Sequence, residues 1–367
     1  MKIRGAILRE AQSRFVVDEL TLEDPQPGEV LVRVGASGVC HSDQHLVSGA
    51  MKHPMPVVVG HEGAGVVEAL GAGLSGLKVG DHVIFNWAPD CGRCFYCERG
   101  KPNLCETFIG PIWAGTMLDG STRLKWRGLP VYHFCGLASF AEFAVVPKES
   151  CVAVRRDVPL AVAALVGCAV ATGVGAVMYT AGVRAGESVV VLGCGGVGLS
   201  IVQGAKLCGA GTIIAVDKHA AQLEMAKKLG ATAAVMADEQ MLTKIRELTG
   251  GRGADCVFEA VGLPALQEIA LGAARPGGQL VLAGLSPMGS GTNLPGAVIT
   301  RQEKVIKGCY YGSINARRDF PLILELYAAG KLRLDELISR QFKLEQINEA
   351  FEAMLGGEVA RGVIVFD

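Results

Sequence analysis

The chain has almost no net charge and no apolar leader, and each absence excludes a class of protein. Its 367 residues include 35 Lys and Arg against 36 Asp and Glu, which gives a formal net charge of −1. That balance leaves no electrostatic footprint for nucleic acid or an anionic surface. Residues 1–10 contain no apolar run of the kind that secretory signals carry. We therefore expect no nucleic-acid partner and no secretion.

Long uncharged stretches are also scarce, and the one that stands out is poor in large apolar side chains. No charged residue occurs between Asp157 and Arg184, which is long enough to span a bilayer. The stretch is built from Ala, Gly and Val, with few Leu, Ile or Phe residues and no aromatic belt. We interpret it as a buried helix and a connection at a domain junction. A transmembrane helix is the alternative, and we expect no membrane partner.

Cysteine, in contrast, is abundant and clustered. The 12 cysteines are not spread in even pairs, and without a secretory signal they favour a reducing, cytoplasmic location and metal binding over disulfides. Four of them lie within 15 residues: Cys91, Cys94, Cys97 and Cys105. The repeated two-residue gap lets successive thiolates converge on one cation. Four thiolates fill a tetrahedral shell, so this cluster predicts a structural zinc site.

A second metal site is indicated by residues that are far apart in the sequence. The apolar run Val57–Val67 contains the adjacent pair His61 and Glu62, followed by glycines that we expect to turn the backbone tightly. Cys40 precedes this run and Cys168 follows it at a distance. Two thiolates and one imidazole leave the fourth zinc position open, as catalytic sites do. A core histidine with two buried free cysteines is the alternative.

The first 150 residues are rich in strand and turn patterns. Glu29–Gly35 alternates as a half-buried strand, and Val66–Leu70, Asp81–Phe85 and Phe140–Val146 are further expected strands. The polar, glycine-containing segment Gly110–Tyr132 is interpreted as an exposed insertion.

From Gly186 onward the pattern changes to alternating strands and helices. The expected strand Glu187–Leu192 leads into G-x-G-x-x-G, then a helix at Leu199–Gly209, then the strand Thr212–Asp217. Each glycine has a separate purpose: the first permits the turn, the second lets a pyrophosphate approach the backbone, and the third allows close helix packing. The acid at the end of the second strand can accept from ribose hydroxyls. The expected dinucleotide-binding residues are Gly193, Gly195, Gly196, Val197, Gly198 and Asp217, with Lys218 able to soften a preference for NAD over NADP.

The alternation continues to Tyr310 and gives six strands in all, enough for a complete doubly wound sheet. The tail beyond it is expected to fold back onto the first domain. The predicted fold class is therefore α/β with two domains. The expected boundaries are 1–169 with 311–367 for the catalytic zinc domain, and 170–310 for a Rossmann dinucleotide-binding domain.

Four features follow one another along the chain: Cys40 with His61 and Glu62, the four-cysteine cluster, Cys168, and the glycine motif with Asp217. In this order they resemble the zinc-containing medium-chain alcohol dehydrogenases over essentially the whole chain. The retained segment Gly110–Tyr132 is similar to that of the dimeric, long-insertion branch. The resemblance implies a GroES-like first domain and an NAD-dependent enzyme that interconverts alcohols with aldehydes or ketones. It also implies two zinc ions per chain, a small-molecule substrate, and a homodimer or possibly a tetramer.

The resemblance also assigns roles to individual residues. It makes Cys40, His61 and Cys168 the catalytic zinc ligands, with Glu62 beside the zinc and Asp43 orienting the ligand histidine. The remaining assignments are a proton relay through Ser42 and His45, pyrophosphate contacts from His41 and Arg361, and a substrate pocket containing Met51, Trp87 and Phe134. Surface histidines are the alternative for His41 and His45.

Other functions remain open within the same fold and outside it. A glutathione-dependent formaldehyde dehydrogenase acting on S-(hydroxymethyl)glutathione is disfavoured because the loop Ser48–His53 has no acid to hold that substrate. A polyol dehydrogenase is disfavoured because Cys168 stands where that branch often has Glu. A zinc-ribbon nucleic-acid module leaves the glycine motif unexplained, and a non-catalytic nucleotide-binding protein is a further alternative.

Overall fold

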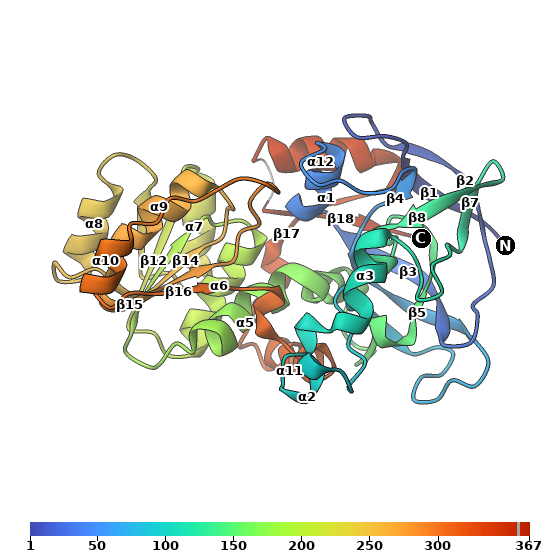
Figure 1. Ribbon diagram of the computed structural model, residues 1–367, viewed down its shortest axis with the longest axis horizontal. Helices are drawn as coiled ribbons and strands as arrows, with labels where there is room; N and C mark the ends of the chain where they lie inside the picture. Colours follow the sequence, from blue (N-terminus) through green and yellow to red (C-terminus); the bar gives the residue numbers. More distant parts are fainter. Residues whose placement is uncertain (358–359) are drawn as a thin grey trace. The chain divides into compact units, whose positions relative to one another are not determined.

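The computed structural model describes residues 1–357 and 360–367 and divides into two compact units (Figure 1). Unit 1 comprises Met1–Cys168, Asn315–Gly330 and Leu334–Asp367, and unit 2 comprises Ala169–Ile314 and Lys331–Arg333. Residues 169, 311–314 and 331–333 thus lie in unit 2, whereas the sequence prediction places them in the first domain. Most of the tail belongs to unit 1, because its last strand pairs with an early strand of that unit.

Unit 1 contains a small closed barrel in which distant segments alternate. Its strands, in the order β1-β2-β7-β8-β4, are β1 (Lys2–Leu8), β2 (Val16–Leu22), β7 (Leu124–Trp126), β8 (Leu129–His133) and β4 (Val57–Val58). The hairpin β7–β8 closes the barrel by pairing with β2 on one side and β4 on the other. The residues that line its interior are therefore far apart in the chain.

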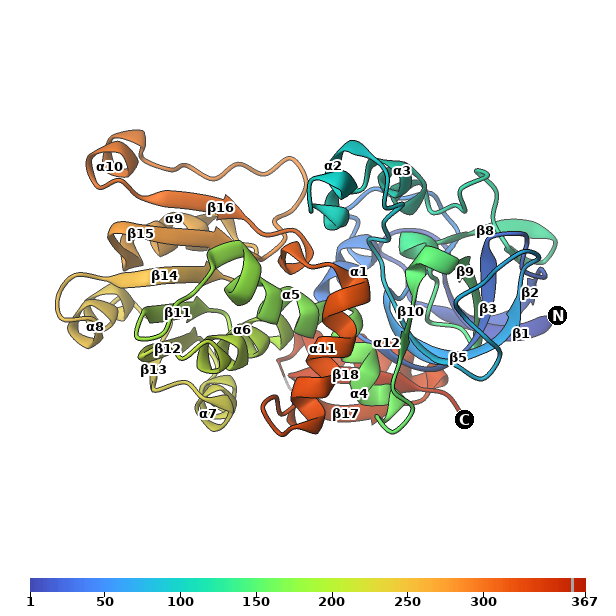
Figure 2. The ribbon, with the colours of Figure 1, turned by 90° about the horizontal axis from the view of Figure 1, so that it is seen from below.

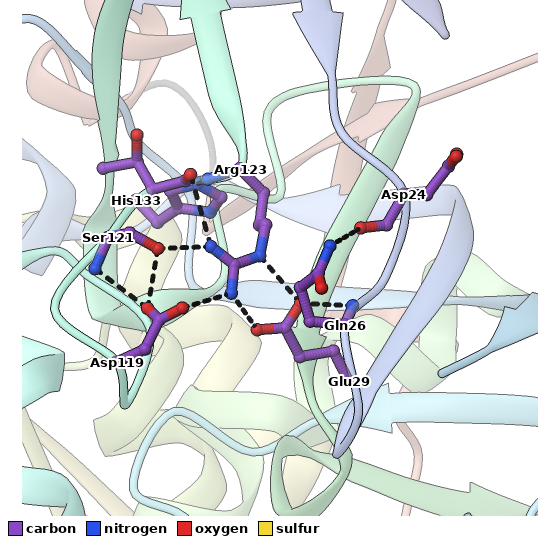
Figure 3. A network of polar contacts seen from close by, with 8 residues as sticks. Asp24, Gln26, Glu29, Asp119, Ser121, Arg123 and His133 are labelled. Atoms are coloured by element: carbon purple, nitrogen blue, oxygen red, sulfur yellow. Dashed lines mark hydrogen bonds and ion pairs between the residues drawn. The ribbon is translucent and has the colours of Figure 1, made fainter. Parts of the chain in front are cut away.

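The prediction that Gly110–Tyr132 is an exposed insertion is wrong for much of its length. Met117, Leu124 and Val131 are buried in unit 1, and residues 124–126 and 129–133 are barrel strands. The buried Arg123 guanidinium donates to both oxygens of Glu29, at 2.9 and 2.6 Å, and to Asp119 at 2.8 Å (Figure 3). Polar composition misled here because Arg123 is buried and paired with Glu29 rather than solvated.

A larger sheet in unit 1 has the order β10-β6-β5-β3-β18-β17, with β9 pairing the first half of β3. Its central strand β3 spans Glu29–Gly38 and buries the alternate residues Val30, Val32 and Val34, as its period predicts. The other strands are β5 (Glu62–Leu70), β6 (His82–Phe85), β9 (Phe143–Pro147), β10 (Cys151–Val154), β17 (Ile338–Phe342) and β18 (Arg361–Val365). The helices of this unit are α1 (His41–Val47), α2 (Phe95–Glu98), α3 (Glu106–Ala114), α4 (Leu160–Leu165), α11 (Ala316–Ala328) and α12 (Ile347–Leu355).

Unit 2 is a six-stranded parallel sheet with helices on both faces, and it confirms the doubly wound prediction. Figure 2 shows its strands side by side in the order β13-β12-β11-β14-β15-β16. They are β11 (Ser188–Leu192), β12 (Thr212–Asp217), β13 (Ala233–Met236), β14 (Ala254–Glu259), β15 (Ala274–Leu282) and β16 (Val305–Gly308). The helices are α5 (Ala171–Gly175), α6 (Gly196–Leu207), α7 (Ala220–Leu229), α8 (Met241–Leu248), α9 (Pro264–Ala273) and α10 (Gly296–Arg301).

The two faces of this sheet have different partners. Val190 and Leu192 pack in a core cluster with residues of α8 and α9. The intervening Val191 points to the other face, where a Cβ added at Gly198 of α6 would lie 3.4 Å from it. A parallel strand covered on both faces is apolar where it is buried, which explains the run Val189–Leu192.

The uncharged stretch forms a nearly continuous helical segment, Leu160–Ala181. Among the described residues it is the one helix long and apolar enough to cross a membrane, and 89% of its most apolar window is buried in protein. The segment changes to wider π-helical turns at Val166–Val170 and at Ala176–Ala181. Such turns often mark functional sites, and the first of them contains Cys168.

Candidate metal centres and nucleotide-binding turn

Three buried side chains of unit 1 converge as the sequence predicts. Cys40 lies at the start of α1, His61 immediately precedes β5, and Cys168 lies in the first π-helical turn. One ligand atom from each lies within 4.8 Å of the others, and the His61 Nε2 is 3.3 Å from the Cys168 sulfur. Two sulfurs and one imidazole nitrogen at this spacing fit the donor set of zinc.

Asp43 fixes the orientation of this histidine. Its Oδ1 lies 2.8 Å from His61 Nδ1 and also accepts from the Gly60 amide, while its Oδ2 accepts from the Cys40 amide. Burial lowers the pKa of His61, but Asp43 and Cys40 together outweigh burial and raise that pKa to about 10. With Nδ1 held by Asp43, Nε2 is the nitrogen directed at the sulfurs, so Asp43 occupies the predicted orienting position.

The two thiols of the triad form a coupled pair. The hydrogen bond from Cys168 holds the pKa of Cys40 well below its usual range, and the same contact raises the pKa of Cys168 well above it. The two sulfurs are therefore close enough to interact. A divalent cation would pair with both thiolates, which supports a metal site over two inert core cysteines.

Glu62 and Arg361 form a buried ion pair beside the triad. Glu62 opens β5 and Arg361 opens β18, and both side chains are almost fully enclosed in unit 1. The neighbouring Gly38 has no side chain in their way, since a Cβ there would lie 2.0 Å from a Glu62 carboxylate oxygen. Glu62 thus lies next to the metal ligands as predicted. The predicted pyrophosphate contact of Arg361 remains a prediction.

The glycines around His61 act differently from the prediction. The tight turn is made by Gly60, which precedes the histidine and has φ +92°. Gly63 and Gly65 follow it inside β5, where they permit close contacts rather than a turn. A Cβ at Gly65 would lie 2.2 Å from the Arg33 carbonyl oxygen of the paired strand β3. The sequence indicated that glycines matter here, but it did not show which one makes a turn and which ones permit close contacts.

Aromatic rings surround the histidine of the triad. The rings of Trp87 and Phe134 meet His61 edge to face, with centroids 6.4 and 5.6 Å away. His53 and Trp113, which sequence reasoning missed, extend this group through Phe134 at 5.7 and 6.5 Å. His53 lies two residues after the predicted pocket residue Met51, which is half-buried, and that proximity was the available signal.

Cys135 is a further buried residue that sequence reasoning missed. It directly follows Phe134 and adopts φ +56°, a conformation that side chains rarely take outside glycine. Burial raises the pKa of its thiol well above the usual range, and the charges of Asp43 and Cys40 add to that rise. The thiol is therefore near the triad, although it is not within the ligand set.

The predicted relay and phosphate-binding side chains lie on α1. Ser42 and His45 are half-buried and three residues apart on this helix, while His41 at its first position is exposed in unit 1. Residues three apart lie on the same side of a helix. The roles of all three remain predictions.

The cysteine cluster also assembles. The sulfurs of its four members lie within 4.8 Å of one another in the segment that includes α2. A hydrogen bond from the Thr107 hydroxyl lowers the pKa of Cys91 to about 6, whereas burial raises that of Cys97 to about 12. Four sulfurs leave no position for a substrate, so the arrangement fits a structural zinc ion.

In unit 2 the glycine motif forms the expected turn between β11 and α6. Gly193 has φ +93°, and a Cβ at Gly198 would lie 1.8 Å from its carbonyl oxygen. Gly195 is the N-terminal cap of α6 and has open space where its side chain would be. Gly196 and Val197 form the first helical turn. The open backbone at a helix N-terminus suits a pyrophosphate.

Asp217 is held ready at the end of β12. Its Oδ2 accepts from the Cys194 amide at 2.7 Å, and its Oδ1 accepts from the His219 amide at 2.9 Å. These bonds join the glycine turn to the end of the second strand and fix the carboxylate. Lys218 lies between Asp217 and His219 in the sequence.

Comparison with known proteins gives matches over the whole chain. Residues 26–156 match the model of the alcohol dehydrogenase GroES-like domain, and residues 196–329 match that of zinc-binding dehydrogenases. The NDMA-dependent alcohol dehydrogenase of Amycolatopsis methanolica is 41% identical over 368 residues, which cover 100% of this chain and 99% of that protein.

Two solved structures are similar along their full length. Benzyl alcohol dehydrogenase from Acinetobacter calcoaceticus has a TM-score of 0.94 and 32% identity, with 100% of each chain covered. A short chain alcohol dehydrogenase from E. coli, complexed with NADH, has a TM-score of 0.82 and 25% identity, with 100% of this chain and 99% of that chain covered. The predicted β-rich and Rossmann fold class is confirmed by these matches.

Proposed function

Because this chain belongs to the zinc-binding alcohol dehydrogenases, we propose that it interconverts alcohols with aldehydes or ketones and that NAD exchanges the hydride. The observation that carries the proposal is the buried triad of Cys40, His61 and Cys168, with the histidine held by Asp43. When bound, zinc supplies Lewis-acid chemistry and the nicotinamide carries hydride. We further propose that the four-cysteine cluster holds a second, structural zinc ion, and that the chain is of the long-insertion branch.

In this proposal the chain's own residues position the reactants and move the proton. Asp43 keeps His61 Nε2 directed at the sulfurs, and the rings of Trp87 and Phe134 exclude water beside it. Ser42 and His45 carry the hydroxyl proton of the substrate along α1 toward solvent. Glu62 and Arg361 place paired charges beside the triad without a net charge.

The aromatic surroundings support aromatic primary alcohols as the substrate class. Trp87 and Phe134 flank the ligand histidine, and Trp113 and His53 continue the same group of rings. Flat rings pack edge to face against such walls. The similar structure of a benzyl alcohol dehydrogenase agrees with this choice, whereas the loop Ser48–His53 offers no acid to a glutathione conjugate.

A substrate screen tests the proposed function. Purified protein is assayed with ethanol, benzyl alcohol, sorbitol, and formaldehyde with and without glutathione, each against NAD and NADP. Benzyl alcohol with NAD is expected to give the highest kcat/KM. Activity confined to formaldehyde with glutathione, or to sorbitol, would assign the chain to another branch, and no activity with any alcohol would refute the proposal.

NDMA dependence is a second candidate, favoured by the relative that carries it in its name. The same screen therefore includes NDMA, alone and together with NAD. Turnover that requires NDMA would replace NAD as the proposed co-substrate. Turnover with NAD alone, unchanged by NDMA, would retain it.

The choice between NAD and NADP is expected to depend on Asp217. Asp217→Gly removes the carboxylate that accepts from ribose hydroxyls and repels a 2′-phosphate, so the preference for NAD is expected to fall by at least about tenfold. Asp217→Asn is the matched variant, because it removes the charge and keeps an amide oxygen for the Cys194 or His219 amide. The measurement is the ratio of kcat/KM for the two cofactors. An unchanged ratio in both variants would place ribose recognition elsewhere.

We also propose a homodimer in the cytoplasm. In the sheet order β16 is an end strand, and its first residue, Val305, is an exposed apolar side chain of unit 2. Exposed strand edges readily pair with another chain. None of the twelve cysteines, all within the described residues, is in a disulfide, which supports a reducing compartment. Analytical ultracentrifugation distinguishes a dimer from a monomer or tetramer.

A further inference from the structure

A buried carboxylate lies at the end of β14 and takes no part in the proposed chemistry. Glu259 is fully enclosed in unit 2, and its Oε1 accepts from the backbone amides of Val261 and Gly262, both at 2.8 Å. These bonds fold the chain sharply after the strand. A buried carboxylate must be matched by donors, so the shape of this loop is set by Glu259.

Gln267 on α9 connects that carboxylate to two other segments. Its Nε2 donates to Glu259 Oε2 at 3.3 Å and to the Ser286 hydroxyl at 2.9 Å, while its Oε1 accepts from the Thr292 hydroxyl at 2.6 Å. Ser286 and Thr292 both lie in the segment between β15 and α10. One buried amide therefore holds the loop after β14 and the segment after β15 together.

The loop held by Glu259 lies directly against the glycine turn. The Ala260 amide donates to the Leu192 carbonyl at the end of β11, 2.9 Å away. A Cβ added at Gly193 would lie 2.4 Å from Val261 Cγ2, so the valine packs onto the first glycine of the motif. Gly262 is similarly close to the next segment, with a would-be Cβ 2.3 Å from the Leu285 carbonyl oxygen.

These contacts lie where a parallel sheet binds ligands. The chain runs from β11 outward to β13 and then crosses to β14 on the other side of β11. Ligands of doubly wound sheets bind outside the carboxyl ends of the strands at such a switch point. Leu192 and Glu259 are register partners at the ends of β11 and β14, so the Glu259 loop forms one wall of this point.

We propose that Gln267 is a positioning residue for dinucleotide binding, acting through Glu259 and the Ser286–Thr292 segment on the wall beside Gly193. The proposal rests on the proposed function, because it requires a dinucleotide at the glycine turn. Gln267 itself touches none of the glycines in these contacts. It fixes the two segments in one arrangement before the cofactor arrives, which lowers the ordering cost of binding.

The test compares the buried Gln267 with the half-buried Gln279, which lies in the same unit. Gln267→Leu removes the side-chain amide that bonds to Glu259, Ser286 and Thr292. Gln279→Leu is its matched control, because Gln279 donates to the Ala181 carbonyl and the Cys256 sulfur, away from the carboxyl ends of the strands. The dissociation constant of NADH is measured by fluorescence titration, and KM for NAD and kcat are measured with benzyl alcohol. Gln267→Leu is expected to raise the dissociation constant and KM at least about tenfold while kcat changes less than about threefold. Gln279→Leu is expected to leave all three values within about twofold.

Thr292→Val keeps the proposal testable if Gln267→Leu does not fold. This nearly isosteric change removes only the hydrogen bond from the Thr292 hydroxyl to Gln267 Oε1. Amide hydrogen exchange of residues 260–263 and 284–293, measured without cofactor, is expected to accelerate in Thr292→Val and in Gln267→Leu but not in Gln279→Leu. If wild-type protein binds NADH and both Gln267→Leu and Thr292→Val bind it equally well, Gln267 has only a structural role and the inference is overturned. If wild-type protein binds neither NADH nor NADPH, the proposed cofactor is wrong and the inference falls with it.

Discussion

Serine in place of Cys168 is expected to leave a folded protein that holds one zinc ion per chain and turns over at least about 100-fold more slowly. The physical reason is the donor set: a serine hydroxyl is a much poorer zinc ligand than a thiolate, and the triad has only three protein donors. Because even residues behind the ligands change metal affinity by about 10- to 100-fold, loss of a ligand should cost at least as much. Metal content is measured by elemental analysis and turnover with benzyl alcohol.

Cys135→Ser is the matched control for that substitution. Cys135 is also a buried thiol near Asp43 and Cys40, yet it lies outside the ligand set. We expect this variant to retain two zinc ions, and Cys97→Ser to lose the other ion together with stability of its segment. Two zinc ions and near-normal turnover in Cys168→Ser would remove Cys168 from the metal. Loss of zinc from Cys135→Ser would show that any change near the triad has this effect.

The candidate metal ligands could be predicted largely because metal-binding cysteines follow characteristic spacings in a sequence. Cys91, Cys94 and Cys97 are spaced so that one backbone turn delivers three sulfurs, and the structure assembles them with Cys105. The glycine motif and Asp217 were equally readable, since their spacing reflects a strand, a turn and a helix. The remote Cys168 could be named as a candidate, but choosing it over a buried free cysteine needed the family resemblance. Its place depends on a π-helical turn, and no periodicity in the apolar run Leu160–Ala181 indicates one.

The remainder of the site depends on contacts between distant segments, and no motif or spacing in the sequence indicates these contacts. His53 and Trp113 are linked to His61 through the ring of Phe134. Phe134 lies 81 residues after His53 and 21 residues after Trp113 in the chain. Gly38 accommodates the ion pair of Glu62 and Arg361, and nothing in its neighbourhood along the chain suggests this. The arrangement at Gly38 follows from the pairing of β3 with β5 and β18, which the sequence pattern does not specify.

Methionine in place of Arg123 is expected to destabilise unit 1 by about 3–5 kcal/mol, because it leaves the Glu29 carboxylate buried without its counter-charge. The pair is bidentate, both side chains are almost fully buried, and Glu29 also accepts from the Gln26 amide (Figure 3). The urea midpoint of zinc-loaded protein measures the change. Arg127→Met is the control in the same hairpin: its pair with Asp18 is exposed, and its loss should cost about 0–1 kcal/mol.

A double variant separates the buried charge from lost packing. If the uncompensated carboxylate causes the loss, Arg123→Met combined with Glu29→Leu should recover much of the stability, since an apolar pair can replace a buried ion pair. If the double variant is as unstable as the sum of the single ones, packing or the bonds to Asp119 and Ser121 dominate, and the charge argument is wrong. The substitution is also expected to affect substrate binding. The Arg123 backbone amide, which the substitution keeps, donates to His133, and His133 ends β8 immediately before Phe134. Loss of the guanidinium contacts should let this backbone shift, so Arg123→Met should raise KM for benzyl alcohol while Arg127→Met should not.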